Sequence, residues 1–480
     1  MNVGRPCKAL LARRGFVVAV AAVVMLSLGF AWGFVVDDAL IVARFSWVVR
    51  ASGRHAFVLD GPLVDGVTPL PYPWIVAPFA CSVVGALLAQ RLVGVGAVVA
   101  GLTLLAERVA RAGNTEGGAG RGAALAGVVL AASSFPLAAH SSSGLETGIA
   151  TGLVAAALAL AVGEGETEGR CSSMLFGLAC TFRPELLPAA LAAVCVRMTH
   201  ARAAAHLASV AGPWIVVVIV RATVFGSPLP LSVLAKPSDL RHGLVYVGAA
   251  LLVTGLYVLP LASVPAFRSS DALRRVRRSA VTLAAVHGVV VACVGGDWMP
   301  YARLMVPVVP AITVFVASVR WPVARAGIVL VAVASNLAFG WRHRAEAVIV
   351  ASTRERVIAE LIPVLAGSSR IAGLDVGFLG AAFRGPVVDL AGLTDPEVAR
   401  LRGGHTSKVL PEGFLDERGV DTLVLWAPSG SRTGLGPSAT FGRVVESRLA
   451  RSPAVARVFT EAQRIRWDSS GAELVIFTRR

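Results

Sequence analysis

Residues 16–36 read FVVAVAAVVMLSLGFAWGFVV, an apolar stretch that ends at the acidic pair Asp37-Asp38. An α-helix needs about 20 such residues to cross the ~30 Å hydrocarbon core of a bilayer. Comparable runs recur as far as Gly340. The composition agrees, because 55% of the 480 residues are hydrophobic, 15% are charged and the mean hydropathy is +0.71. The sequence therefore predicts a polytopic α-helical membrane protein with about ten or eleven spans.

A basic segment precedes the first run, and no acidic residue occurs before Asp37. Basic residues beside a span favour the cytoplasmic side of a membrane. We therefore expect the N-terminus in the cytoplasm and a multi-pass protein of the plasma membrane. The run could instead be a cleaved signal peptide. However, Phe30 and Trp32 crowd the cleavage site, so an uncleaved first helix is favoured.

The remaining apolar runs place the other spans, with an error of about two to four residues at each end. They cover residues 70–89, 92–106, 122–139, 148–162, 172–196, 203–225, 243–266, 279–294, 304–319 and 323–340. A count from a cytoplasmic N-terminus puts the basic cluster at residues 274–278 inside, but it leaves Arg108 and Arg111 outside, against the charge rule. One segment near residues 70–106 or 172–198 is therefore expected to be broken or re-entrant.

The composition changes near residue 342 from apolar to mixed. We predict helices at residues 352–365, 395–402 and 441–450, and strands at residues 370–374, 386–390, 421–426 and 473–478. Strands that alternate with helices are typical of an α/β domain. The expected division is a membrane domain, residues 1–341, with a first external loop at about residues 37–69, and a soluble extracytoplasmic α/β domain, residues 342–480.

The net charge of +16 does not indicate a nucleic-acid-binding protein, because the Arg residues cluster in short connectors between apolar runs. Such clusters are typical of contacts with anionic lipid headgroups.

The six Cys residues show no CxxC motif and no Cys/His spacing. Neither a disulfide framework nor a zinc site is therefore predicted.

The acidic pair Asp37-Asp38 lies where the first helix leaves the bilayer. Two adjacent carboxylates there suit a general base or a divalent-cation site, Mg²⁺ or Mn²⁺. A solvated helix end is the alternative. Arg44 follows among apolar residues at helical spacing, which predicts a short amphipathic helix along the membrane surface.

Three later segments place charged residues at or near membrane depth. Glu146 lies in a Ser- and Thr-rich connector, where helix capping is the alternative to function. Arg183-Pro184-Glu185 interrupts an apolar run, and whether Arg183 binds substrate or neutralises Glu185 stays open. Residues 295–303 contain Asp297 and end at Arg303, which opens a span and suits an anionic group. Lys236 is a second candidate phosphate contact or a lipid anchor.

Taken together, these segments resemble the GT-C class of membrane glycosyltransferases, in the bacterial branch that includes the mycobacterial terminal arabinofuranosyltransferase of cell-wall arabinan. Residues 37–44 match the branch's Asp-Asp-Ala-x-Ile-x-x-Arg motif, and residues 66–71 match a Gly-x-Thr-x-Pro-Leu motif without its usual Tyr and one spacer. Later matches are residues 143–147, 181–185, 226–230, 295–300 with Arg303, 389–396 and 403–405. The resemblance covers most of the chain, with the motifs in the family's order.

The resemblance implies an inverting glycosyltransferase that moves a sugar, arabinofuranose or another pentose or hexose, from a polyprenyl-phosphate carrier. The acceptor would be a cell-envelope glycan or protein on the external face of the bacterial plasma membrane. The catalytic carboxylate would be Asp37 or Asp38, and some relatives use a divalent cation there while others do not. Candidate contacts to substrate or phosphate are Arg44, Glu146, Arg183, Lys236, Asp297 and Arg303.

Two other functions remain open, a multi-spanning transporter or flippase of lipid-linked sugars and a non-catalytic assembly protein. Residues 392–395 and His405 could bind acceptor glycan, but tight turns with structural caps are favoured.

Overall fold

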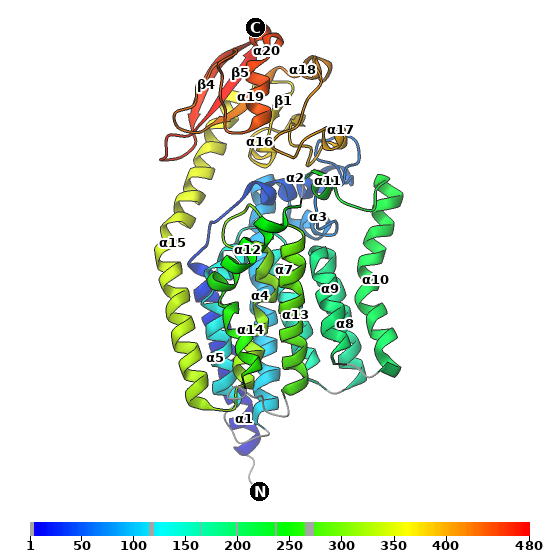
Figure 1. Ribbon diagram of the computed structural model, residues 1–480, viewed down its shortest axis with the longest axis vertical. Coiled ribbons are helices and arrows are strands. Elements are labelled where there is room, and N and C mark those ends of the chain that lie inside the picture. Colours follow the sequence, from blue (N-terminus) through cyan, green and yellow to red (C-terminus); the bar gives the residue numbers. More distant parts are fainter. Residues whose placement is uncertain (1–3, 115–119, 164, 198–199, 236–237, 265–272) are drawn as a thin grey trace. The chain divides into compact units, whose positions relative to one another are not determined.

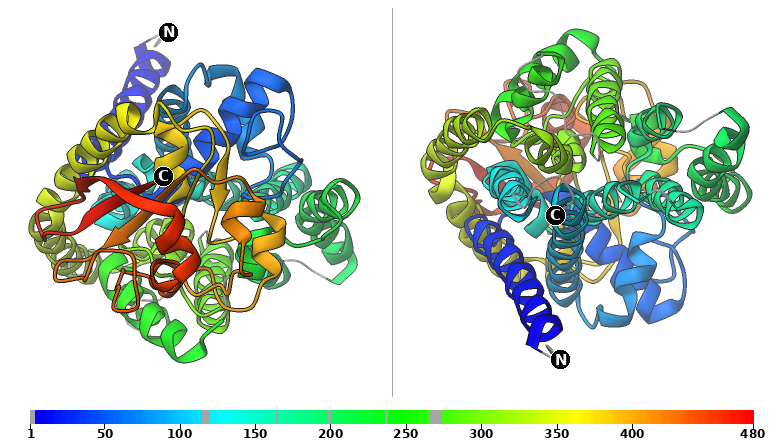
Figure 2. Two further views of the ribbon diagram at one scale, coloured as in Figure 1. Left: turned by 90° about the horizontal axis from the view of Figure 1, so that it is seen from above. Right: turned by 90° about the horizontal axis from the view of Figure 1, so that it is seen from below.

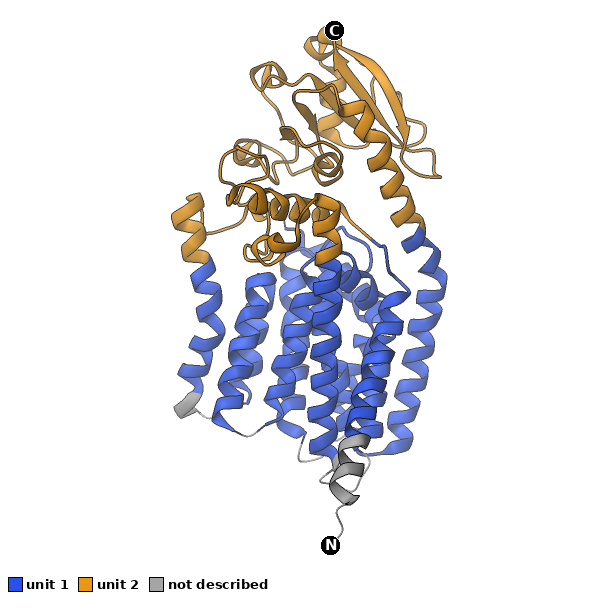
Figure 3. Ribbon diagram, turned by 180° about the vertical axis from the view of Figure 1, so that it is seen from behind, with its two compact units in different colours: residues 1–34, 90–217, 238–348 blue, residues 35–89, 218–237, 349–480 orange. Residues whose placement is uncertain are grey.

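The computed structural model describes residues 4–114, 120–163, 165–197, 200–235, 238–264 and 273–480. The chain is mostly helical and divides into two compact units, coloured separately in Figure 3. Unit 1 comprises residues 1–34, 90–217 and 238–348, and unit 2 comprises residues 35–89, 218–237 and 349–480.

Unit 1 is a bundle of helices, labelled in Figure 1 and seen end-on at the right of Figure 2. Three of its helices, α4 (Val83–Asn114), α10 (His200–Phe225) and α15 (Pro322–Leu365), continue past the unit boundaries. The other α-helices are α1 (Gly4–Gly29), α5 (Gly120–Ala132), α6 (Phe135–Ser142), α7 (Thr147–Ala161), α8 (Glu166–Phe182), α9 (Leu187–Cys195), α12 (Leu240–Thr254), α13 (Arg274–Cys293) and α14 (Pro310–Ser318). Short 3₁₀ helices are η2 (Pro184–Leu186), η3 (Leu256–Ser263) and η5 (Arg303–Val308).

Within unit 1, α7 packs against α8, α14 against α5 and α13 against α9. Glycines allow α4 and α7 to approach closely. A Cβ atom on Gly101 would lie 2.4 Å from the Gly152 carbonyl oxygen, and one on Gly152 would lie 2.3 Å from that of Ala97. Small residues at such contacts are typical of helix packing inside membranes, where backbone proximity replaces the hydrophobic effect.

The chain is a multi-pass membrane protein. Among the described residues, four helices are long and apolar enough to cross a bilayer: Val83–Gly113, Ala203–Phe225, Arg274–Cys293 and Pro322–Leu365. Two bent pairs, α5 with α6 and α12 with η3, raise this number to six if each pair is one span. Other apolar stretches, including Thr147–Ala161 and Pro184–Cys195, form helices shorter than this criterion requires.

The lipid-facing helices are recognisable by their exposed apolar side chains. In α10, only 11% of the most apolar 18-residue stretch is buried within the protein. The same share is buried in α15. Ile215 and Val216 on α10 and Leu330 and Val331 on α15 are exposed. Apolar surface of this extent is stable in contact with lipid rather than with water.

The predicted break near residues 70–106 is confirmed, but the two spans expected there are wrong. The proline-rich start forms only α3 (Tyr72–Val76) and the 3₁₀ helix η1 (Ala77–Phe79), and α4 then runs without interruption past the polar pair Gln90-Arg91. The Arg91 guanidinium donates to the Gly33 carbonyl and lies over the Trp32 ring, so its charge has partners within unit 1.

The second expected break is also present. The run predicted at residues 172–196 is divided at Arg183, where α8 ends and η2 begins with Pro184. A proline cannot donate to the helix and disfavours helical geometry at the residue before it, which explains the position of the break.

Unit 2 contains the α/β domain predicted at the C-terminus. Its sheet has the strand order β2-β1-β3-β5-β4, with β1 parallel to β2 and β3, and with β5 antiparallel to β3 and β4. The strands, orange to red for the later ones in Figure 2 (left), are β1 (Ile371–Gly373), β2 (Val387–Asp389), β3 (Thr422–Ala427), β4 (Phe459–Arg466) and β5 (Glu473–Arg479). The helices are α2 (Asp37–Ser52), α11 (Leu231–Ala235), α16 (Val376–Ala382), α17 (Pro396–Arg400), α18 (Phe414–Glu417), α19 (Val444–Arg451) and α20 (Pro453–Val458).

All four predicted strands of the domain are present, and β4 was missed. The expected boundary at residue 342 does not coincide with a break, because α15 continues through it to Leu365. Unit 2 also includes residues 35–89 and 218–237, which the sequence analysis assigned to the membrane domain.

The loop after β2 is held by one buried carboxylate. Asp389 is fully buried and accepts hydrogen bonds from the backbone N–H groups of Ala391, Gly392 and Thr394 and from the Thr394 hydroxyl. Asp395 then caps α17 by accepting from Glu397 and Val398. These residues therefore form a tight turn with structural caps, the reading favoured for residues 392–395.

We predict that Asp389→Asn destabilises unit 2 by about 1–3 kcal/mol, because the new amide N–H₂ faces backbone N–H donors and leaves them without an acceptor. The thermal unfolding midpoint of the full chain in detergent micelles measures the effect. The exposed Glu412 supplies the control, Glu412→Gln. Equal midpoints for the two variants would contradict the structural role of Asp389.

Candidate functional site

The first Asp of the acidic pair is bound by backbone amides of unit 2. The Asp37 carboxylate accepts hydrogen bonds from the N–H groups of Gly377, at 3.1 Å, and Phe378, at 2.9 Å. Both belong to the first turn of α16, whose N–H groups have no partner within the helix. Asp37 thus caps the N-terminus of α16 although it belongs to another segment. In most helices a local Asp or Ser has this role.

Arg44 lies two turns further along α2 and binds the opposite end of α16. Its side chain is fully buried, and all three guanidinium nitrogens donate to backbone carbonyls. The acceptors are Phe57 (2.9 Å), Gly380 (2.7 Å), Phe383, Arg384 (3.2 Å) and Gly385 (2.8 Å).

This geometry corrects two predictions made from the sequence. Arg44 is not a phosphate contact, because its donors are used inside the protein. The helix that carries it does not lie on a membrane surface through its apolar face. Ile41, Phe45 and Val48 on that face are buried within unit 2.

Burial and neighbouring charges act strongly on the Asp37 carboxyl. Burial, together with repulsion from Asp375 and Asp38, raises the pKa of Asp37 well above its usual range, and the two amide hydrogen bonds oppose that rise. Asp375 is in turn paired with Arg443, whose Nη2 lies 2.8 and 2.9 Å from the two carboxylate oxygens. Arg354 lies over Phe378 and Trp467, at 4.8 and 3.7 Å from the ring centres.

None of Asp375, Arg354 and Arg443 was selected from the sequence. Each lies in the C-terminal part of the chain, more than 300 residues from Asp37, in a stretch that no motif marks. Only the packing of α16 against α2 brings them to the acidic pair.

The acidic pair does not form a preformed metal centre. In the part of the chain that the structure describes, no group of three His, Cys, Asp or Glu side chains is placed to hold a metal ion. One carboxylate of the pair is already bound by two amides. A divalent cation at the acidic pair therefore stays a prediction, without a set of three ligands among the described residues.

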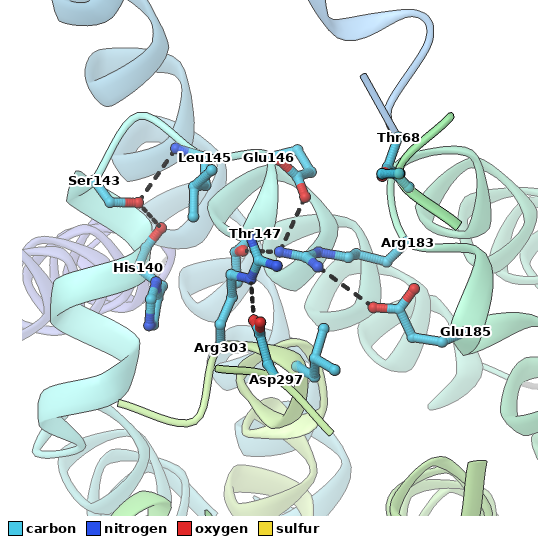
Figure 4. A network of polar contacts seen from close by, with 12 residues as sticks. Thr68, His140, Ser143, Leu145, Glu146, Thr147, Arg183, Glu185, Asp297 and Arg303 are labelled. Carbon is cyan, nitrogen blue, oxygen red and sulfur yellow. Dashed lines mark hydrogen bonds and ion pairs between the residues drawn. The ribbon is translucent and has the colours of Figure 1, made fainter. Parts of the chain in front are cut away.

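The polar residues of unit 1 converge in a second cluster, drawn in Figure 4. Arg183 lies at its centre, with Nη2 2.9 Å from a Glu146 oxygen and donating at 2.6 Å to the Thr147 hydroxyl. Its Nη1 lies 3.5 Å from a Glu185 oxygen. The side chains of Arg183 and Glu146 are 4% and 5% exposed. Arg183 therefore neutralises Glu146 first and Glu185 second, which resolves part of the question left open by the sequence.

The adjacent pair comes from the segment between α13 and η5. Arg303 Nε lies 2.7 Å from an Asp297 oxygen, and both side chains are largely buried. Tyr301 and Ala302 have φ angles of 63° and 52°, a conformation that side chains with a Cβ atom rarely adopt. His140 Nε2 donates to the Pro300 carbonyl at 2.9 Å and joins this segment to α6. Strain of this kind persists only where surrounding contacts hold it.

The structure thus brings together four predicted residues: Glu146, Arg183, Asp297 and Arg303 (Figure 4). It places Asp37 and Arg44 against α16, and Asp38, which is partly exposed, beside Asp37 in the first turn of α2. Lys236 lies outside the described residues. Thr147 was overlooked as an Arg183 partner, although its position beside Glu146 at the start of α7 was visible in the sequence.

Comparison with known proteins identifies the fold. No protein-family model matches the chain, and no curated protein matches its sequence. The fold is similar to that of ArnT from Cupriavidus metallidurans in the apo state, with 15% identity, a TM-score of 0.54, and coverage of 97% of this chain and 98% of that chain. It is also similar to ArnT bound to undecaprenyl phosphate, with 14% identity, a TM-score of 0.56, and coverage of 96% and 97%. The predicted GT-C fold is therefore confirmed over nearly the whole chain.

We predict that Arg183→Met strongly destabilises unit 1, by about 3 kcal/mol or more, because it leaves buried carboxylates uncompensated. Arg183→Lys keeps the charge and should recover part of the loss. Arg170→Met is the control, since Arg170 forms an exposed pair with Glu166 that contributes about 0.5 kcal/mol or less. Thermal unfolding in detergent measures all three variants. An Arg183→Met protein as stable as Arg170→Met would show that the cluster is hydrated rather than buried.

Proposed function

We propose that this protein is a membrane glycosyltransferase that transfers a sugar from a polyprenyl-phosphate carrier to an acceptor hydroxyl. One observation carries the proposal: the fold is shared from end to end with ArnT, a GT-C glycosyltransferase that has been seen with undecaprenyl phosphate bound. Because a shared fold does not by itself determine the reaction, the proposed mechanism is based on the residues of the candidate site.

The reaction needs a base and cations rather than a strong general acid. The acceptor oxygen forms a bond to the anomeric carbon while the bond from that carbon to the phosphate oxygen breaks. The acceptor proton passes to a carboxylate, and the polyprenyl phosphate leaves as an anion. Attack opposite the leaving group inverts the anomeric centre. A carboxylate of the acidic pair is the proposed base. The cations proposed for the departing phosphate are Arg183, Arg303 and Lys236.

The acidic residues of the unit 1 cluster have a role in this scheme. Glu146 and Asp297 hold Arg183 and Arg303 in fixed orientations, at 2.9 and 2.7 Å. Cations fixed in advance stabilise developing charge without reorganising during the reaction. A phosphate bound there would compete with these carboxylates, so the paired arrangement also limits how tightly the product phosphate is held.

We further propose that the donor sugar is arabinofuranose or another pentose or hexose, and that the acceptor is a cell-envelope glycan or protein. The basic N-terminal segment supports a cytoplasmic N-terminus, with the C-terminal domain and the reaction on the external face of the bacterial plasma membrane. The motifs shared with the arabinofuranosyltransferase branch support the pentose.

The decisive assay uses the full chain in proteoliposomes with short-chain polyprenyl-phosphate sugars that carry a radiolabelled arabinofuranose, another pentose or a hexose. We expect label to enter oligosaccharide acceptors. Joint replacement Asp37→Ala/Asp38→Ala should lower the rate by about 10²-fold or more, the usual contribution of a positioned base. Glu412→Gln is the control.

Movement of lipid-linked sugar across the vesicle without a new glycosidic bond would identify a flippase instead. Unchanged transfer by the double variant would remove the acidic pair from the mechanism.

We predict that transfer persists in excess EDTA, because the described residues do not supply a set of three metal ligands. Initial rates with and without chelator measure this. If chelation abolishes transfer and Mg²⁺ or Mn²⁺ restores it, the substrate phosphate must complete a site that the protein begins with one or two carboxylates.

A further inference from the structure

We propose that the two residues of the acidic pair have different tasks. Asp37 is a positioning residue that fixes α2 to α16 of the C-terminal domain, and Asp38 is the carboxylate that contacts the acceptor hydroxyl. The second part of this inference rests on the proposed function. The first part rests on geometry within unit 2 alone.

The contacts of α2 and α16 form a clamp with two ends. Asp37 and Arg44 are seven residues apart, or about 10 Å along a helix. The groups that they bind on α16 run from the amide of Gly377 to the carbonyl of Phe383, which spans about 9 Å. The two helices therefore run in the same direction, and one pair of side chains reaches both ends of α16.

The charges of the clamp match the helix that they hold. The N-terminus of a helix carries a partial positive charge and the C-terminus a partial negative charge. Asp37 lies at the first and Arg44 at the second. Each thus satisfies backbone groups that the short helix cannot pair internally.

Glycines at the contact leave no space between the helices. A Cβ atom on Gly377 would lie 2.2 Å from the Asp37 carbonyl oxygen and 2.7 Å from Asp37 Oδ1. One on Gly380 would lie 2.7 Å from Arg44 Cδ. The α16 backbone thus covers the Asp37 carboxylate directly, and a sugar hydroxyl cannot approach it from that side.

Asp38 points elsewhere. Successive residues on an α-helix are rotated by about 100° around the axis. The Asp38 side chain therefore leaves α2 in a different direction from Asp37, although both residues are partly exposed. We assign the ligand contact to Asp38 because α16 binds and covers Asp37.

This assignment gives the C-terminal domain a role in the proposed reaction. It holds the first turn of α2 through α16, and α16 is itself anchored through Asp375 and Arg443. The domain would then be part of the catalytic centre rather than an appended binding module.

Four variants of the full chain test the proposal, each followed by transfer kinetics and by hydrogen exchange at the amides of residues 377 and 378. Gly377→Ala keeps every charged group but displaces Asp37, so kcat should fall about tenfold or more, as for a small misplacement, and exchange should become faster. Asp37→Asn keeps one acceptor oxygen and should behave in the same way. Asp38→Asn should lose about 10²-fold or more in kcat with exchange unchanged. Gly367→Ala is the matched control, because a Cβ atom there meets nothing within 4 Å.

Unchanged exchange in both Asp37→Asn and Gly377→Ala would overturn the clamp. A normal kcat in Asp38→Asn together with a lost one in Asp37→Asn would show that the roles are reversed. If the wild-type chain transfers no sugar, the catalytic role of Asp38 falls with the proposed function, while the exchange data still decide the clamp.

Discussion

The organisation of unit 2 depends on the contact between α2 and α16, which Asp37 and Arg44 make. A carboxylate and a guanidinium, two turns apart on one helix, bind the two ends of another helix that is more than 300 residues away in sequence. Backbone groups at helix ends must find partners when they are buried. Here a single motif of the first connector supplies those partners, which ties the sheet domain to the start of α2.

The same constraint shapes the cluster in unit 1. A buried charge is stable only when an opposite charge and hydrogen bonds compensate for lost hydration. Arg183 meets this condition through Glu146, Thr147 and Glu185, and Arg303 meets it through Asp297. The proline after Arg183 opens the helix so that the guanidinium reaches Glu146 from a broken end. Each of these charged side chains thus lies within 3.5 Å of an opposite charge, and the three carboxylates outnumber the two guanidinium groups by one.

The proposed function assigns a separate task to each cluster. The acidic pair at the start of α2 provides carboxylates, and the unit 1 cluster provides oriented guanidinium groups. Transfer from a phosphate leaving group needs these two functions and little else from the protein. The glycosyltransferase proposal assigns the base to the carboxylates and phosphate binding to the guanidinium groups. The similarity of the fold to ArnT supports the same proposal.

The sequence by itself determined the membrane class and the C-terminal α/β domain, because long apolar runs and alternating elements leave local periodic signals. The GT-C fold was expected from the resemblance of ordered motifs to that family. The sequence also selected Glu146, Arg183, Asp297 and Arg303 among its candidate contacts, together with Arg44 and Lys236. It missed β4, since only two of its eight side chains are buried and no apolar alternation marks it. It also divided α4 at Arg91, whose charge is satisfied by the distant Gly33 and Trp32.

Tertiary structure alone decided what the charged motif residues do. Arg44 has the composition and position of a phosphate ligand, yet five carbonyl groups use its donors. Asp37 and Asp38 are equivalent in sequence, and only the approach of Gly377 distinguishes them. A charged side chain takes its role from the partners that surround it, and those partners are set by packing between segments that are distant in sequence.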